Sequence, residues 1–328
     1  MKSGIYPLLT MCLFLTLSAI GQPKASGSKK PLIIFDTDMG PDYDDVGAIS
    51  LLHRLAKNGE CKILATVASD AHATIAPTIA VFNQHFGRPD IPVGHAAAGA
   101  PGYTANNHWN DSLIVRFPLK KKIAAYPSAV DVYRQVLAKQ KDQSVTLVTV
   151  GFISNVNALL KSGPDNYSAL SGMELVKRKV KNWVAMAGAF PQGKEFNVDQ
   201  DTTASFEAFA LWPGKILFSG FEIGQQIYTG GRVALGDISK NPVAWAYRYN
   251  LKTYDRTPQQ NRPSWDQTAV LCAVRDPGRY FTVSGPGKFI ADRQGANTWE
   301  AEDDGLHHYL SHKHPFEQIA KEIEDLMQ

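Results

Sequence analysis

Five aspartates stand within ten residues near the start of the chain, in the stretch FDTDMGPDYDD. They are Asp36, Asp38, Asp42, Asp44 and Asp45, and no lysine, arginine or histidine lies among them. Carboxylates this close together repel one another, and a bound cation removes that repulsion. Carboxylate oxygens are the ligands that Ca²⁺ and Mg²⁺ prefer. The stretch therefore predicts a hard-cation site or a set of catalytic carboxylates.

Two simpler explanations account for only part of this stretch. Asp44 and Asp45 are placed to open a helix, where the helix dipole favours negative charge. That leaves Asp36 and Asp38, which follow a buried apolar run, unexplained. An EF-hand loop is excluded, because its twelfth position would be Gly47 where a glutamate is needed.

The elements that position these residues follow from an alternation of short apolar runs with segments of helical periodicity. The expected strands are 31–35, 61–68, 145–150, 182–188 and 215–220. The expected helices are 44–59, 76–87, 128–140 and 202–212. This order predicts an α/β fold with an open, mostly parallel, Rossmann-like sheet and helices on both faces.

The alternation weakens after about residue 230. We expect extra helices around the active site there, then a strand near 280–285 and a C-terminal helix from about Pro315. Sites in parallel sheets form at the carboxyl ends of the strands. The aspartate stretch occupies such a place, and so do residues 150–155 and 187–197.

Composition indicates an ordinary globular protein. The chain has 328 residues, of which 44% are hydrophobic and 20% charged, and a formal net charge of +3 with scattered basic residues. Nothing in this pattern favours a nucleic-acid partner. No repeat or linker divides the chain, so we predict one domain over 22–328.

Residues 1–21 are typical of a secretory signal peptide, with a short basic start, an apolar run and small residues before Gly21. We therefore expect an exported protein, periplasmic or secreted, that is free of the membrane once the signal is removed. The mature chain keeps Cys61 and Cys272, and the sequence leaves their pairing open.

Four ordered segments resemble motifs of the nucleoside hydrolases, the inosine–uridine-preferring family. DTDMGPDYDDVGAI resembles the N-terminal signature, with two residues more than its shortest form. The other three are VTLVTVGFISNVNALL (145–160), MAGAFPQGKEFNVDQDTTAS (186–205) and SWDQTAVLCAV (264–274). Together they span 32–274, and residues past 275 add nothing to the match.

The resemblance implies hydrolysis of the N-glycosidic bond of a ribonucleoside to free base and ribose, with a small-molecule nucleoside as the partner. It implies a Ca²⁺ cofactor held by Asp38, Asp45, the backbone carbonyl of Val150 and Asp266, with Asp36 orienting these ligands. Asp38 would also be the general base that takes a proton from the attacking water. No covalent enzyme intermediate is needed.

The resemblance also implies the substrate contacts. Asp44, Glu195 and Asn197 would hold ribose hydroxyls. Trp265 stands where many members have a histidine, and it resembles the purine-selective members in which a tryptophan stacks on the base. We therefore expect purine nucleosides to be preferred.

Two departures from the family pattern concern the ribose. Asp70 stands where the family commonly has asparagine, and the loop at 189–194 is short. These departures keep open a catalytically silent periplasmic protein that binds nucleoside or sugar. FDTDMG also resembles the start of haloacid-dehalogenase-type phosphotransferases, with Asp36 as nucleophile and Asp38 as acid/base.

Two further segments have a less specific interpretation. His108 and Trp109 fall where the family has a base-facing loop, and a surface loop is the alternative. Residues 298–310 concentrate Asp, Glu and His, and we expect a solvated loop without an assigned role. The oligomeric state stays open, a homo-oligomer included.

Overall fold

The computed structural model describes residues 1, 30–121, 123–255 and 260–328. Apart from Met1, the predicted signal peptide lies outside the described residues. No helix in the described part of the chain is long and apolar enough to cross a membrane. Cys61 and Cys272 are both buried and free, which answers the question of their pairing.

A ten-stranded sheet forms the centre of the molecule, with the strand order β3-β2-β1-β4-β5-β7-β12-β10-β11-β6. A small second sheet pairs β8 with β9. The strands are β1 (Leu32–Thr37), β2 (Lys62–Ala68), β3 (Val93–Gly94), β4 (Val145–Thr149), β5 (Val180–Met186), β6 (Gln192–Lys194), β7 (Ile216–Ser219), β8 (Tyr228–Thr229), β9 (Arg262–Pro263), β10 (Thr282–Ala291), β11 (Ala296–Ala301) and β12 (His307–Ser311).

The sheet is parallel from β3 to β12 and antiparallel beyond it. Parallel pairs join β2 to β3, β1 to β2, β1 to β4, β4 to β5, β5 to β7 and β7 to β12. β10 then pairs antiparallel with β12 and β11, and β11 with β6. The predicted α/β fold with a mostly parallel sheet is confirmed, and the antiparallel extension is an addition to it.

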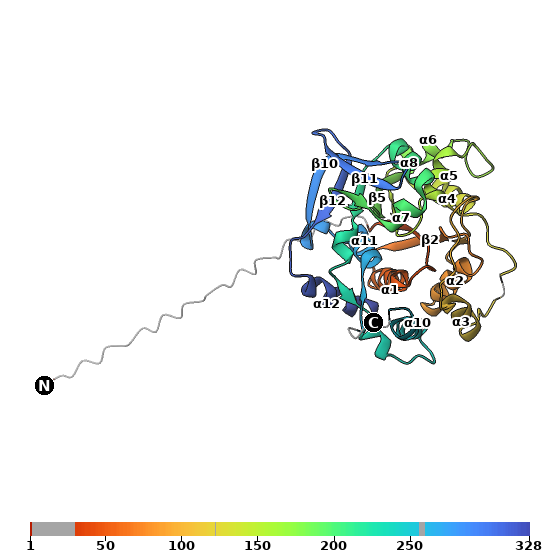
Figure 1. The fold of residues 1–328 in the computed structure, drawn as a ribbon, viewed down its shortest axis with the longest axis vertical. Coiled ribbons are helices and arrows are strands. Elements are labelled where there is room, and N and C mark those ends of the chain that lie inside the picture. Colours follow the sequence, from red (N-terminus) through yellow and green to blue (C-terminus); the bar gives the residue numbers. More distant parts are fainter. Residues whose placement is uncertain (2–29, 122, 256–259) are drawn as a thin grey trace.

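Helices cover both faces of this sheet (Figure 1). They are α1 (Asp44–Lys57), α2 (Ile75–His85), α3 (Trp109–Arg116), α4 (Ala129–Ala138), α5 (Ser154–Lys161), α6 (Gly172–Lys179), α7 (Phe196–Gln200), α8 (Thr202–Leu211), α9 (Phe221–Gly224), α10 (Pro242–Asn250), α11 (Trp265–Val274) and α12 (Phe316–Met327). Short 3₁₀ or π turns lie at η1 (Val233–Leu235), η2 (Leu251–Asp255) and η3 (Pro277–Arg279).

The central strand β1 shows why the sheet is buried on both sides. Ile33 and Phe35 pack into one core with α1, α2, α3, α10, α11 and α12. Ile34, between them, packs into a second core with α4, α5, α6 and α8. Successive side chains of a strand point to opposite faces, so an uninterrupted apolar run is what two covered faces require.

The C-terminal part differs from the expected solvated loop at 298–310. β11 and β12 take up most of this segment and join the main sheet. Its aromatic side chains pack inward: Trp299 and Tyr309 contact each other and Phe190. The prediction was wrong because charged residues and histidines along these strands mask the alternation of buried and exposed positions.

Candidate functional site

A cavity of about 360 Å³ opens at the carboxyl ends of the central strands. Its lining residues come from the ends of β1, β4 and β5 and from the loops and helices around them: Asp38, Pro41, Asp42, Asp44, Tyr103, Thr104, Asn106, Val150, Met186, Glu195, Phe196, Asn197, Phe221, Tyr254, Arg262, Trp265 and Asp266. Cavities of this size hold small-molecule ligands.

Most residues expected at the site line this cavity. The strand register explains part of the convergence, because Asp36 of β1 lies beside Thr149 of β4, and Thr149 lies beside Ala185 of β5. The residues that directly follow these strands therefore meet. Of the predicted set, Asp38, Asp44, Val150, Glu195, Asn197, Trp265 and Asp266 line the cavity, whereas Asp36 and Asp45 lie behind its wall.

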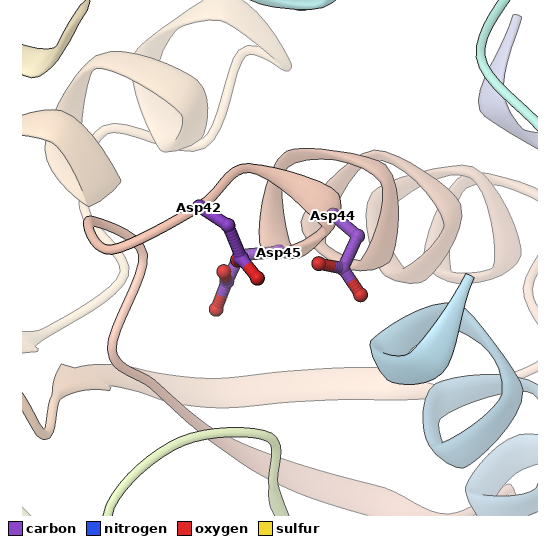
Figure 2. A group of neighbouring side chains, drawn as sticks. All are labelled: Asp42, Asp44 and Asp45. Carbon is purple, nitrogen blue, oxygen red and sulfur yellow. The ribbon is translucent and has the colours of Figure 1, made fainter. Parts of the chain in front are cut away.

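Three carboxylates gather at the start of α1. Oxygens of Asp42, Asp44 and Asp45 lie within 4.8 Å of one another. Figure 2 shows the three side chains leaving the turn and the first helical turn on the same side. This cluster shares only Asp45 with the predicted ligand set and does not include Asp38 or Asp266. It adds Asp44, which was predicted to hold ribose, and Asp42, to which the sequence assigned no role. Asp42 lies in the N-terminal motif, which is two residues longer here than the shortest form of the family's signature.

Asp45 meets the requirement for a cation ligand most clearly. It is 1% exposed, and its Oδ1 accepts hydrogen bonds from the Thr37 hydroxyl and, at 3.1 Å, from the Met39 backbone N–H. Its Oδ2 is buried and accepts no hydrogen bond from any described residue. A buried carboxylate oxygen without a donor is costly unless a cation binds it. The all-oxygen surroundings suit a hard divalent ion.

The pKa shifts of the neighbouring carboxyl groups also favour a cation site. Burial, and then the charge of Asp42, raise the pKa of Asp45 to about 7. Burial and the charge of Asp45 raise the pKa of Asp38 well above its usual value. Burial and the charge of Asp44 do the same to Asp266. Burial and mutual repulsion therefore disfavour the ionised form of all three carboxyl groups, and a bound cation would favour it.

Asn197 and Gly151 fix the wall next to Asp38. The Asn197 Nδ2 donates to the carbonyl of Val150 at 3.3 Å and to that of Met186 at 3.2 Å, so one amide links the ends of β4 and β5. A Cβ on Gly151 would stand 2.4 Å from the Asp38 backbone nitrogen. Glycine is therefore needed after Val150 for β4 to approach Asp38 this closely.

Glu195 caps the short helix α7 as well as lining the cavity. Its Oε1 accepts from the Asn197 N–H at 2.8 Å, and its Oε2 accepts from the N–H groups of Gly188 at 3.0 Å and Val198 at 3.3 Å. Burial raises its pKa to about 7 despite these bonds. The loop and the carboxylate thus hold each other in place.

The antiparallel extension supports this loop from outside. The short segment at 189–194 ends in β6, which pairs with β11. Asn297 of β11 is 2% exposed, and its Oδ1 accepts from the Ala189 N–H at 2.9 Å while its Nδ2 donates to the Ala189 carbonyl at 2.8 Å. The C-terminal segment without a predicted role therefore positions the motif that carries Glu195.

Asp36 is fully buried away from the cavity. Its Oδ2 accepts from the Tyr133 hydroxyl at 2.6 Å, and both oxygens accept from Asn155 Nδ2 at 3.2 and 3.1 Å. Burial raises its pKa to about 7. A phosphoryl nucleophile must reach its substrate, so this placement disfavours the phosphotransferase hypothesis and agrees with an orienting role.

Asp70, which stands where the family commonly has asparagine, holds a neighbouring loop by hydrogen bonds. It is 2% exposed, and its carboxylate accepts from the N–H groups of His72 at 2.6 Å and Tyr103 at 2.9 Å. Through Tyr103 it secures one wall of the cavity. His108 stands at the N-cap position of α3 without a side-chain capping bond, and Trp109 is fully buried in the core. Neither residue lines the cavity.

Trp265 opens α11 and forms part of the cavity wall. Its indole Nε1 donates to the Phe221 carbonyl at 2.9 Å, and the Phe221 ring lies 5.5 Å away at an interplanar angle of 22°. The Arg262 guanidinium lies 5.1 Å from the Trp265 ring centre. Nothing in the sequence pointed to Arg262, because two of its carboxylate partners, Asp42 and Asp44, are distant along the chain.

Similarity to known proteins is found at the level of a family and of the fold. A model of the family described as "Inosine-uridine preferring nucleoside hydrolase" matches residues 33–310, beyond the end of the motifs near residue 274. No curated protein matches the chain.

Solved structures show the same fold. A purine-preferring ribonucleoside hydrolase from Gardnerella vaginalis is 20% identical, with a TM-score of 0.70 over 90% of this chain and 98% of that one. A plant nucleoside hydrolase is 21% identical, with a TM-score of 0.66 over 91% and 99%. An inosine-uridine preferring nucleoside hydrolase from Bacillus anthracis is 15% identical, with a TM-score of 0.62 over 90% and 97%.

Proposed function

The chain belongs to the inosine-uridine preferring nucleoside hydrolase family and is a glycosidic-bond hydrolase, and from this premise we propose that it converts purine ribonucleosides to free base and ribose with Ca²⁺ as cofactor. The observation that carries the proposal is the buried oxygen of Asp45 without a donor, beside a cavity lined by Asp38, Asp44 and Asp266. This unpaired oxygen supports a cation site at the carboxyl ends of the strands.

Asp38, Asp45, Asp266 and the Val150 carbonyl would hold the ion, with Asp42 beside them. Bound Ca²⁺ supplies positive charge that orients the attacking water and lowers its pKa. The set is hard and all-oxygen, which suits Ca²⁺.

Asp38 would act as the general base. It lies at the cavity wall, where the proposed cation would keep its carboxylate ionised and so able to accept a proton. It takes the proton from water as the water oxygen bonds to the anomeric carbon. The electrons of the N-glycosidic bond leave with the base, through an oxocarbenium-like transition state.

The ribose hydroxyls would bind Asp44, Glu195 and Asn197. All three line the cavity and are 5% exposed or less. Each also contacts protein backbone, which fixes its orientation before substrate binds. Pre-oriented groups bind ribose at a smaller entropic cost.

The contact between the C-terminal extension and the loop that carries Glu195 can be tested by mutation. Asn297→Ala removes both hydrogen bonds to Ala189, so the loop carrying Glu195 should loosen and kcat/KM for inosine should fall about 10-fold, as loss of about 1–2 kcal/mol of orientation implies. Steady-state kinetics with the exposed control Asn58→Ala checks it. An unchanged Asn297→Ala enzyme would remove the supporting role.

Purine preference gives a second test. Trp265 and Phe221 form an aromatic wall, and a two-ring base gains more from stacking than uracil does. We expect a higher kcat/KM for inosine than for uridine, and Trp265→Ala should lose mainly inosine hydrolysis. Trp245, which stacks on Tyr249 and does not line the cavity, supplies the control Trp245→Ala. A wild type that prefers uridine would contradict the stacking role.

We place this activity outside the inner membrane, because residues 1–21 are typical of a signal peptide. The protein isolated from its own host should begin near Gln22. N-terminal sequencing that finds Met1 or Lys2 intact would argue against export.

The function itself is tested by product analysis. Inosine incubated with the purified protein should give hypoxanthine and free ribose in equal amounts. Transfer of a phosphoryl group to Asp36 would instead support the phosphotransferase, and tight nucleoside binding without products would support a silent binding protein.

A further inference from the structure

Arg262 is a buried cation beside the acidic cluster of Asp42, Asp44 and Asp45. Its side chain is 9% exposed. Its Nη2 donates to Asp42 Oδ2 at 2.5 Å, and its Nη1 donates to Asp255 Oδ1 at 3.0 Å. Its Nε lies 3.7 Å from Asp44 Oδ1, too far for a hydrogen bond but close enough for electrostatic attraction. All three guanidinium nitrogens therefore face carboxylates of the protein itself.

Aromatic rings hold the same guanidinium in place. Its central carbon lies 5.2 Å from the ring centre of Tyr43, 5.3 Å from that of Tyr254 and 5.1 Å from that of Trp265. Stacking and cation–π contacts of this kind suit a planar arginine better than a lysine. The positive charge of Arg262 is therefore fixed beside the acidic cluster.

The additional length of the N-terminal motif accounts for these contacts. The two extra residues fall between Gly40 and the final pair of aspartates, in the part that contains Asp42 and Tyr43. Asp42 pairs with Arg262. The Tyr43 hydroxyl donates to Asp255, and the Tyr43 ring packs on the guanidinium. The longer motif thus contacts both Arg262 and the second carboxylate that holds it.

Arg262 makes the aspartates of the cluster unequal. Asp42 carries the guanidinium on its Oδ2, whereas the buried Oδ2 of Asp45 has no donor among the described residues. A divalent ion at Asp42 would approach a fixed positive charge and compete with it for the carboxylate. At Asp45 the ion would find an unpaired oxygen. The charges therefore direct a cation to Asp45 and away from Asp42.

Asp44 is oriented by the same arginine. Its Oδ2 accepts a hydrogen bond from the Asp266 N–H at 3.2 Å, while its Oδ1 faces the Arg262 Nε. The guanidinium also offsets the repulsion between the carboxylates of Asp42 and Asp44. Asp44 lines the cavity, where the proposed function assigns it to the ribose. Both of its oxygens are thus held before a substrate binds.

We propose that Arg262 is a positioning residue that keeps Asp42 out of the cation site, so that the chain binds one Ca²⁺ and not two. Arg262 supplies, at the Asp42 side of the cluster, the counter-charge that a second divalent ion would otherwise supply. By the same contacts it keeps Asp44 turned toward the ribose. This inference rests on the proposed function.

The test compares the two carboxylates that hold Arg262. Asp42 and Asp255 both pair with it, but only Asp42 belongs to the acidic cluster and lines the cavity. Asp42→Asn and Asp255→Asn each replace one carboxylate by an amide of the same size. Calorimetric titration of metal-free protein with Ca²⁺ should find one ion per wild-type chain. Both variants should weaken binding to a similar extent, within about 10-fold of each other, because each leaves Arg262 with one carboxylate fewer.

The outcomes separate this inference from the proposed function. A loss of Ca²⁺ affinity more than about 10-fold greater in Asp42→Asn than in Asp255→Asn would make Asp42 a ligand and overturn the inference, even if inosine is hydrolysed. Two ions per wild-type chain would also overturn it. One ion per chain and matched variants, but no hydrolysis of any nucleoside, would overturn the proposed function and leave the inference standing. No Ca²⁺ binding by wild type would overturn both.

Kinetics test the effect on Asp44. Arg262→Lys keeps the charge but loses the fork, so the KM for inosine should rise about 10-fold while kcat changes less, because a contact to bound substrate is weakened. Arg275→Lys is the matched control, because Arg275 pairs with Glu60 at 2.7 Å and does not line the cavity. It should leave both constants unchanged. An unchanged KM in Arg262→Lys would remove the role in positioning Asp44.

Discussion

Asp38→Asn should lower kcat for inosine by about 10²–10⁴-fold, the usual loss when a general base is removed. The amide cannot accept the proton of the attacking water, although its oxygen can still contact a cation. Nucleoside binding should partly survive, because the ribose contacts come from other residues. Rapid-quench or steady-state kinetics together with calorimetry on the variant would measure both quantities.

Asp36→Asn is the matched variant. Asp36 is fully buried behind the wall, and an asparagine there can still accept the hydrogen bond from Tyr133. Its loss of kcat should be clearly smaller than that of Asp38→Asn. The reverse order would identify Asp36 as the reacting carboxylate and refute the assignment of Asp38.

Removing the cation should abolish activity and lower the thermal stability of the protein. A ligand that binds only the folded state stabilises it by about 2.7 kcal/mol at a free concentration 100 times its Kd. Adding Ca²⁺ to chelated protein should therefore raise Tm, and Asp45→Ala should abolish that rise because Asp45 supplies a buried oxygen without another partner. The exposed Asp303 gives the control Asp303→Ala, whose response should match wild type.

The pH dependence adds an independent signature. Asp36 and Asp45 have their pKa values raised from 3.8 to about 7 by burial in the folded protein. Between about pH 4 and pH 7 the folded state therefore holds protons that the unfolded state has lost, so stability without cation should fall as the pH rises through this window. With Ca²⁺ present, scanning calorimetry should find this fall reduced. A chelated protein that is as stable and active at pH 8 as the Ca²⁺-loaded one would contradict the cation site.

The central parallel strands could be predicted because their sequence alone carries the signal. Ile33, Ile34 and Phe35 form an unbroken apolar run, and burial on both faces requires that. β11 and β12 could not, because residues such as His307 are buried through contacts with distant parts of the sheet. Their register depends on partners that a sequence pattern does not reveal.

The site also contains residues that could be predicted from the sequence and residues that could not. Asp38 could be expected at the cavity because it follows a strand, and Asp266 because its segment resembles a motif of the family. Arg262 could not, because its contacts join it to Asp42, 220 residues earlier, and to rings that meet only in the folded protein. Glu195 was expected as a sugar ligand, and its capping of α7 became visible only in the structure.

The most direct test of the central claim is a Ca²⁺ titration of metal-free protein in which free ribose released from inosine is measured. The account predicts no ribose at the start, a rise that follows occupancy of one Ca²⁺ per chain, and no such rise in Asp45→Ala. Full ribose release in the chelated, metal-free sample, or no release from any nucleoside at saturating Ca²⁺, would contradict it.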